Sequence, residues 1–322
     1  MDKSQLALFD SADVAAGLDY RGCIDTVREA MMALSAGRTR QLLRRMIHMG
    51  EGRTFAQMPG SLADDGMFGA KLISVFADPE NPGRRRHRGV IAMFEPESGR
   101  PVAIIDAEEV THLRTAAASA VATDILARRD ARSLLIIGTG GQARTHLEAL
   151  PLVRDFARVA IWGRDAAKAA ALAEDYADRL PTAAVTDLPA EAGRADVICT
   201  LTAASEPVLL GEWLRPGCHV NIVGSSGPGP VEVDSELVAR SRFVADSRAN
   251  ALDAAAEFLV AREAGLVGDD HIVAEIGEVL LGTHSGRQSD ADITAYKSLG
   301  HAVQDLAAAA YLYERTARDD QP

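Results

Sequence analysis

Residues 134–146, LLIIGTGGQARTH, constrain the fold of this 322-residue chain more than any other segment. Four apolar residues run into a G-x-G-x-x-A turn, after which the spacing becomes helical, so the segment predicts a strand, a turn and a helix. Gly138 permits the tight turn, Gly140 lets backbone N–H groups approach a phosphate, and the small Ala143 lets the helix pack against the strand. The helix N-terminus adds partial positive charge. The segment therefore predicts a dinucleotide site.

The surrounding sequence supports this interpretation. From about residue 117 to residue 248, apolar strand-like segments alternate with helical ones. Such alternation predicts parallel strands joined by crossover helices, which is an α/β fold with a doubly wound sheet of the Rossmann type. Two further apolar segments follow, 251–266 and a last helix at 292–317. A glycine-rich turn without a ligand is the alternative for 138–143.

The first third of the chain has a different pattern of apolar residues. Residues 10–36 show helical spacing, and residues 41–58 and 68–77 are strand-like. Residues 89–106 form two apolar runs separated by a Glu-Ser-Gly turn, as in a hairpin. This part is therefore predicted to be a mixed α+β unit.

The length predicts two domains, because 322 residues exceed what one hydrophobic core usually holds. We place a mixed α+β domain at 1–117, completed by a C-terminal helix at 301–322. A Rossmann NAD(P)-binding domain is placed at 118–300.

Composition excludes several kinds of partner. The formal net charge of -12 argues against nucleic acid or an anionic membrane, because both require a basic face. Cys23, Cys199 and Cys218 have neither disulfide nor zinc spacing, so we expect buried thiols in a reducing compartment and no metal site. The first residues do not resemble a signal peptide, and no apolar run reaches the length of a membrane span. We therefore expect a cytoplasmic protein.

The end of the second strand of the Rossmann domain bears on which dinucleotide is bound. In the NAD form of the fold an acidic residue at this place takes the ribose hydroxyls. Here the strand ends in Gly163 and Arg164, and Asp165 is displaced into the next helix. A cation at this position favours a 2'-phosphate, so we predict NADPH. NADH remains the alternative, with Arg164 solvated and Asp165 turned back toward the ribose.

Several segments together resemble the ornithine cyclodeaminase/mu-crystallin family, in order and over residues 10 to 315. They are HLRTAAASAVAT (112–123), GTGGQARTH (138–146), NIVGSSGPGPVEVDSELVARSRFVADSR (221–248), EIGEVLLG (275–282) and DITAYKSLGHAVQDLAAA (292–309). The resemblance implies a homodimer in which the α+β domain binds the substrate and pairs its sheet with that of the second subunit. It also implies chemistry on a small amino or imino acid.

The resemblance assigns three catalytic positions. Lys71, in FGAKLIS, matches the active-site lysine, and Arg45, in LLRRMI, and Arg114, in HLRTAA, match the arginines that hold the substrate carboxylate. The residue types suit these roles, since a guanidinium grips a carboxylate bidentately and burial beside arginines lowers a lysine pKa. A surface or packing role is the alternative for each arginine. A one-residue slip of the strand would exchange Arg45 with Arg44.

The cofactor is expected to contact the strand ends of the Rossmann domain and the segment before the last helix. The predicted cofactor-binding residues are Gly138, Thr139, Gly140, Gly141, Gln142, Ala143, Trp162, Gly163, Arg164, Thr200, Thr202, Val223, Gly224, Ser298 and Gly300.

Two departures from the family pattern bear on the reaction. Cyclodeaminases have an aspartate where this chain has Ser226, and a carboxylate where it has Ala56. Loss of both groups disfavours cyclodeamination, because nothing then holds the terminal ammonium of the substrate. Ser226 resembles instead the ketimine-reductase branch, in which it would line the nicotinamide end of the site.

We therefore predict NADPH-dependent reduction of a small cyclic ketimine, such as pyrroline-2-carboxylate or piperideine-2-carboxylate, to the cyclic amino acid. Arg45 and Arg114 would fix the carboxylate, and Lys71 would keep the imine nitrogen protonated. The alternatives are reductive amination of a 2-oxo acid, as in an alanine dehydrogenase, and a non-catalytic NADPH-binding protein.

Overall fold

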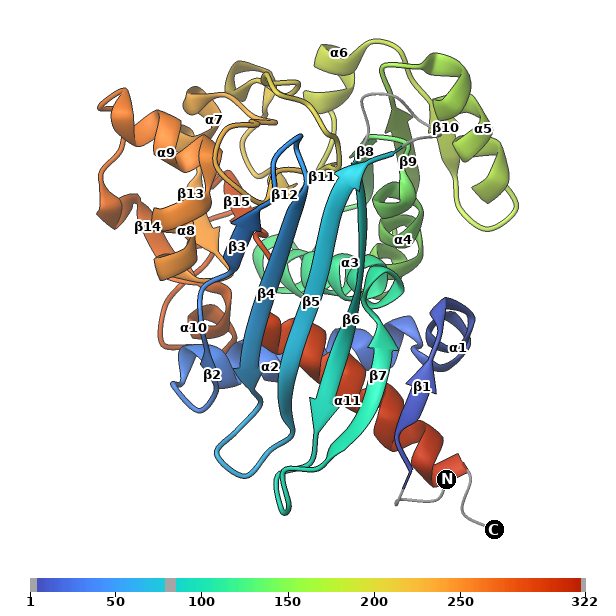
Figure 1. Ribbon diagram of the computed structural model, residues 1–322. Helices are drawn as coiled ribbons and strands as arrows, with labels where there is room; N and C mark the ends of the chain where they lie inside the picture. Colours follow the sequence, from blue (N-terminus) through green and yellow to red (C-terminus); the bar gives the residue numbers. More distant parts are fainter. Residues whose placement is uncertain (1–4, 79–84, 320–322) are drawn as a thin grey trace. The chain divides into compact units, whose positions relative to one another are not determined.

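The computed structural model describes residues 5–78 and 85–319, which divide into two compact units (Figure 1). The first unit comprises Met1–Arg114 and His301–Pro322, and the second comprises Thr115–Gly300. Helix α3 (Ala107–Leu126) crosses the division. No helix in the described ranges is long and apolar enough to cross a membrane.

The first unit is built on a mostly antiparallel sheet of order β1-β7-β6-β5-β4-β2, with β3 also paired to β4. Only β1 and β7 pair in parallel among its described strands. The strands are β1 (Ala7–Phe9), β2 (Arg40–Gln41), β3 (Arg45–His48), β4 (Thr54–Ser61), β5 (Phe68–Ala77), β6 (Arg85–Phe94) and β7 (Pro101–Asp106). Strand β5 and the β6–β7 hairpin lie where the apolar pattern predicts them.

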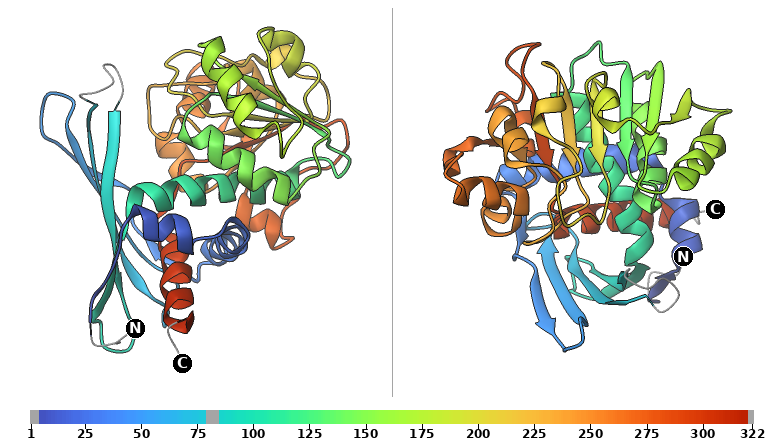
Figure 2. Two further views of the ribbon diagram at one scale, coloured as in Figure 1. Left: turned by 90° about the vertical axis from the view of Figure 1, so that its right-hand side faces the viewer. Right: turned by 90° about the horizontal axis from the view of Figure 1, so that it is seen from above.

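Helices cover one face of this sheet. Helix α11 (Ala302–Asp319) packs on β4, β5 and β6 and also on α2 (Tyr20–Ser35), as Figure 2 shows. The segment 10–36, whose spacing is helical, forms two helices, α1 (Ser11–Gly17) and α2. Asp19 caps the start of α2 by accepting a hydrogen bond from the N–H of Gly22. Apolar side chains on the other face are exposed, among them Leu8, Ile47, Phe76 and Val90.

The second unit is an α/β layer around one parallel sheet, which confirms the predicted fold class. The strand order is β10-β9-β8-β11-β12-β15-β13-β14. Its strands are β8 (Ser133–Ile137), β9 (Arg158–Trp162), β10 (Thr182–Ala184), β11 (Val197–Thr200), β12 (His219–Ile222), β13 (Arg242–Ala245), β14 (Ile272–Glu275) and β15 (Thr294–Lys297). Strands β9 and β10 are added on one side of β8, and β11 and β12 on the other, so the strand order reverses between β8 and β11. Ligands of doubly wound sheets bind outside the carboxyl ends of the strands at such a switch point.

The helices of the second unit connect these strands. They are α4 (Gly141–Ala149), α5 (Ala166–Tyr176), α6 (Leu188–Ala192), α7 (Ser235–Arg240), α8 (Arg248–Ala254), α9 (Ala256–Glu263) and α10 (Ile276–Leu280), with short 3₁₀ turns at Leu150–Leu152, Gly211–Trp213 and Asp269–His271.

The prediction of one long helix at 292–317 is wrong in its first third. Residues Thr294–Lys297 form strand β15, which lies between β12 and β13, and the helix begins only at Ala302. All four residues of β15 are buried. A strand covered on both faces lacks the alternation of apolar and polar residues that identifies a half-buried strand, so its sequence cannot be told from a buried helix.

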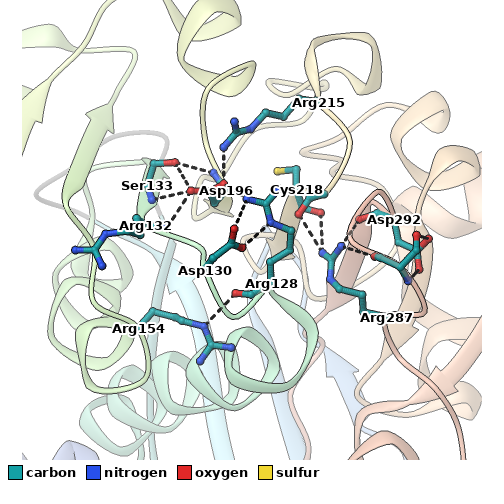
Figure 3. A network of polar contacts seen from close by, with 12 residues as sticks. Arg128, Asp130, Arg132, Ser133, Arg154, Asp196, Arg215, Cys218, Arg287 and Asp292 are labelled. Atoms are coloured by element: carbon teal, nitrogen blue, oxygen red, sulfur yellow. Dashed lines mark hydrogen bonds and ion pairs between the residues drawn. The ribbon is translucent and has the colours of Figure 1, made fainter.

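A polar network ties together the amino ends of the strands in the second unit (Figure 3). Asp196, directly before β11, accepts hydrogen bonds from the backbone N–H groups of Arg132 and Ser133 at 2.9 and 3.0 Å. It also accepts from the hydroxyl of Ser133 at 2.8 Å and from Arg215. Nearby, Arg287 donates to the backbone oxygens of Gly217 and of Leu126. This network joins β8, β11 and β12 at the edge opposite the expected ligand site.

Candidate functional site

Lys71 lies on the covered face of the first unit's sheet. In β5 its register partners are Met58 of β4 and Ile91 of β6, which are 4% and 0% exposed, so apolar side chains flank it on both sides. Lys71 itself is only 4% exposed. A buried lysine requires polar partners, and α11 and α3 supply them.

Asp305, in the first turn of α11, is the central partner. Its Oδ1 accepts hydrogen bonds from Lys71 Nζ at 3.0 Å and from Arg114 Nε at 2.9 Å. Lys71 also donates to the hydroxyl of Thr111 at 2.5 Å, and Arg114 to Oε1 of Gln304 at 3.0 Å. The second oxygen of Asp305, Oδ2, is buried and has no hydrogen-bond partner among the described residues. The structure thus brings together Lys71 and Arg114, which the sequence predicted as site residues, around the carboxylate of Asp305, which it did not predict.

The surroundings shift the pKa values of this cluster. Burial lowers the pKa of Lys71 to about 8, opposed by the Asp305 charge and assisted by the positive charges of Arg114 and Arg44. Burial alone would raise the pKa of Asp305, but Arg114 and Lys71 hold it below its usual range. The cluster therefore combines an ionised carboxylate with a lysine that can exchange a proton near neutral pH.

The structure places Arg45 on the face of the sheet opposite Lys71. The register puts Arg45 in one row with Gln57, Leu72 and Val90, whereas Lys71 lies in the adjacent row. Adjacent rows of a sheet point to opposite faces, so Arg45 faces away from Lys71, and its side chain is exposed. The structure does not bring Arg45 together with Lys71 and Arg114. The charge of the neighbouring Arg44, in contrast, acts on the pKa of Lys71.

The two positions that differ from the cyclodeaminase pattern lie in different units. Ala56 is 2% exposed and lies on β4, on the same sheet face as Lys71. Ser226 lies in the second unit, exposed, in the loop after β12.

The glycine-rich turn forms a cradle at the carboxyl end of β8. Gly138 has φ +129°, and a Cβ there would lie 2.5 Å from the carbonyl oxygen of Leu201, so no other residue fits. Gly140 is the N-cap of α4 and offers no side-chain cap, while a Cβ on it would meet open space. Thr139, Gly141 and Gln142 border this space and Ala143 is buried against the sheet. A helix start of this form suits the pyrophosphate of a dinucleotide.

The acidic residue that follows β9, Asp165, serves as the N-cap of a helix. Asp165 caps α5, accepting hydrogen bonds from the N–H groups of Ala167 and Lys168 at 3.1 and 3.3 Å. Trp162 and Gly163 are partly exposed and Arg164 is exposed. The carboxylate of Asp165 is therefore occupied by the N-terminus of α5, whereas the guanidinium of Arg164 is accessible to a ligand.

The remaining predicted cofactor residues lie at the carboxyl ends of β11, β12 and β15. The hydroxyls of Thr200 and Thr202 donate to Glu232 at 2.9 and 2.8 Å. Val223 is buried and Gly224 is exposed. After β15, Ser298 is buried, and Gly300 donates its N–H to Asp246 at 2.7 Å.

Sequence reasoning missed Asp305, Glu232 and Asp246. Each directly adjoins at least one apolar residue, and each is 0% exposed. That pattern was the available signal, because a carboxylate is rarely buried without partners.

The chain resembles known proteins in both sequence and fold. The model of the ornithine cyclodeaminase/mu-crystallin family matches residues 6–320. A Delta(1)-pyrroline-2-carboxylate reductase of Bacillus cereus is 36% identical over 290 residues, covering 89% of each chain. The solved Delta(1)-pyrroline-2-carboxylate reductase of Thermococcus litoralis, in complex with NADH and L-proline, has a TM-score of 0.92 at 30% identity and covers 98% of each chain. An archaeal alanine dehydrogenase dimer with bound NAD has a TM-score of 0.90 at 30% identity, covering 98% of this chain and 97% of its own. The chain belongs to the ornithine cyclodeaminase/mu-crystallin family.

Proposed function

We propose that the protein reduces the C=N bond of a small cyclic ketimine, pyrroline-2-carboxylate or piperideine-2-carboxylate, to the cyclic amino acid with NADPH. The observation that carries this proposal is the buried contact of Lys71 and Arg114 with one oxygen of Asp305. It provides a proton donor and a carboxylate-binding cation at fixed positions. The similarity to two pyrroline-2-carboxylate reductases supports the same substrate class.

Each cation has donors left for the substrate. Lys71 uses two of its three N–H groups on Asp305 and Thr111, and the third can reach the imine nitrogen directly or through water. Arg114 uses Nε and Nη1 on Asp305 and Gln304, which leaves Nη2 for the substrate carboxylate. Arg44 is the second carboxylate partner in this proposal. A protonated imine nitrogen makes the neighbouring carbon electrophilic, so the role of Lys71 is to keep it protonated.

The second unit holds the dinucleotide in this proposal, and the bound nicotinamide supplies the hydride. The N-terminus of α4 takes the pyrophosphate, and Arg164 takes a 2'-phosphate because Asp165 is engaged as the cap of α5. The two solved relatives were captured with NADH and NAD, so NADH is the alternative cofactor.

We further propose that the protein is a homodimer of the cytoplasm. The uncovered face of the first unit's sheet exposes Leu8 by 72% and Ile47 by 62%, together with Phe76 and Val90. A second subunit would bury these side chains, and the similar archaeal alanine dehydrogenase is a dimer. The three cysteines are buried and free, as a reducing compartment would leave them.

The test is to follow NADPH absorbance after adding either cyclic imine to the purified protein. We expect consumption with the unaltered chain and a loss of about a hundredfold or more in Lys71→Ala. NADPH binding should be unchanged in that variant; its melting temperature should fall, because Asp305 loses a buried partner, so circular dichroism must confirm that the variant is folded at the assay temperature. Absence of turnover with both imines, or full activity in Lys71→Ala, would overturn the proposal.

Alanine-dehydrogenase-like reductive amination is the second candidate, favoured by the similarity to the archaeal enzyme. Rates with pyruvate plus ammonia or methylamine, compared with rates on the cyclic imines, separate the two. Binding of NADPH without turnover of any of these substrates would indicate a binding protein instead. Ala56 and Ser226, in place of two carboxylates, argue against cyclodeamination.

A further inference from the structure

The carboxylate of Glu232 joins two loops at the carboxyl edge of the second unit's sheet. Its Oε1 accepts from the backbone N–H of Thr202 at 2.6 Å, in the loop after β11. Its Oε2 accepts from the backbone N–H of Gly224 at 2.6 Å, in the loop after β12. The hydroxyls of Thr202 and Thr200 add hydrogen bonds of 2.8 and 2.9 Å. Four donors converge on one side chain that is fully buried.

The glycines at this edge show how closely the loops approach. A Cβ on Gly224 would lie 2.1 Å from the carbonyl oxygen of Thr202, and a Cβ on Gly138 would lie 2.5 Å from that of Leu201. The loops after β8, β11 and β12 therefore form one continuous layer of backbone. Within this layer, the carboxylate of Glu232 holds the loop after β11 at a fixed distance from the loop after β12.

A second buried carboxylate fixes Glu232 itself. Oε1 of Glu257, on α9, accepts from the backbone N–H of Glu232 at 3.2 Å and from the hydroxyl of Ser225 at 2.6 Å. Lys297 pairs with Oε2 of Glu257 at 2.7 Å and donates to the carbonyl of Ser225 at 2.8 Å. Lys297 and Glu257 are both 0% exposed as side chains. The side chains of this cluster are thus shielded from solvent and hold the backbone around Glu232 and Ser225.

We propose that Glu232 is a positioning residue for the nicotinamide dinucleotide, acting through the backbone of the loops after β11 and β12. This inference rests on the proposed function, because it requires the cofactor to lie on that layer. Thr200, predicted as a cofactor contact, is 0% exposed, so it acts through its hydrogen bond to Glu232. Glu232 sets how tightly the dinucleotide binds and leaves the chemistry at Lys71 unaffected.

Glu232→Gln tests this assignment. A carboxylate accepts from both backbone N–H groups, whereas an amide has one acceptor oxygen and would turn its NH₂ toward the other N–H. We expect the Kd for NADPH, measured by fluorescence titration without imine, to rise about tenfold, as a displaced backbone cradle would cause. At saturating NADPH, kcat for the imine should stay within about twofold of the unaltered enzyme.

Asp196→Asn is the matched control. Asp196 also joins strands by accepting from two backbone N–H groups and a hydroxyl, but at the amino edge of the same sheet. Both variants should lower the melting temperature, and only Glu232→Gln should weaken NADPH binding. Thr200→Val, which removes one donor to Glu232, provides a milder variant if Glu232→Gln fails to fold, and should raise the Kd about threefold.

The outcomes are distinct. An unchanged Kd in Glu232→Gln or, where that variant does not fold, in Thr200→Val would overturn the inference, as would an equal rise in Asp196→Asn. Binding of NADPH without imine reduction would overturn the proposed function and leave this inference standing. Failure of the unaltered chain to bind either dinucleotide would overturn both.

Discussion

Lys71 and Asp305, 234 positions apart in the chain, form a buried ion pair of 3.0 Å between β5 and α11. Asp305 favours the ammonium form, so it raises the pKa of Lys71 against the effect of burial, and the result is a pKa of about 8. If the ammonium form is the active one, kcat/KM should fall as the pH rises through about 8.

Asp305→Asn should move this alkaline limb to lower pH, because the charge that supports the ammonium is lost. We expect kcat/KM at neutral pH to fall about tenfold or more, since Arg114 also loses its partner. The measurement is the pH profile of kcat/KM for both forms with one imine. Ionisation of the substrate is common to both profiles, so the difference between them reports on the enzyme. If the alkaline limb of the kcat/KM profile lay at the same pH in Asp305→Asn as in the unaltered enzyme, the role of Asp305 would be contradicted.

Arg44 and Arg45 form a natural pair of test and control. The two are adjacent in sequence, yet Arg44 acts on the pKa of Lys71 and Arg45 lies in the row that faces away. Arg44→Ala should raise KM for the imine about tenfold or more by removing a charged contact to the carboxylate. Arg45→Ala should leave steady-state kinetics within about twofold. The reverse pattern would restore the original assignment of Arg45.

Arg164 should decide the choice of cofactor. Arg164→Ala is expected to raise the Kd for NADPH about tenfold while the Kd for NADH stays constant, because only NADPH carries the 2'-phosphate. Titration of both dinucleotides with both proteins measures this. Equal effects on the two cofactors would show that Arg164 does not read the phosphate.

Asp196 should stabilise the second unit in a pH-dependent way. Burial would raise its pKa, but hydrogen bonds from Arg132 and Ser133 and the charge of Arg215 hold it below its ordinary value of 3.8. A lowered pKa in the folded state means that the stabilisation is complete above the unfolded pKa and is lost as the pH falls through the folded one.

Asp196→Asn should therefore cost about 2–3 kcal/mol at neutral pH. The difference from the unaltered protein should begin to shrink below about pH 4, where the unfolded carboxylate takes up a proton, and should be lost once the pH falls below the lower pKa of the folded state. Denaturant unfolding at several pH values measures both. If the difference in unfolding free energy between the two proteins stayed constant down to acid pH, the ionised form of Asp196 would contribute no more stability than the protonated form.

The sequence predicted those structural features whose signal lies within a few neighbouring residues. Strand β5 and the turn at Gly138 were predictable, because alternation, apolar runs and glycine spacing act within a few residues. Strand β15 was not, since its burial on both faces results from neighbours distant in the sequence. The choice between Arg44 and Arg45 depends on the register, which β4 sets and the local sequence does not. Asp305 acquires its role only where α11 packs on β5.

The placement of α11 affects how the protein is made. Helix α11 covers β4, β5 and β6 but is synthesised after the whole of the second unit. On the ribosome, the face of the sheet that α11 covers therefore stays uncovered while the 186 residues of the second unit are translated, at roughly 5–20 residues per second. Exposed apolar surface promotes aggregation, so the nascent chain is prone to aggregate during that interval. Synthesis of α11, and not emergence of the first unit's sheet, allows Lys71 to pair with Asp305.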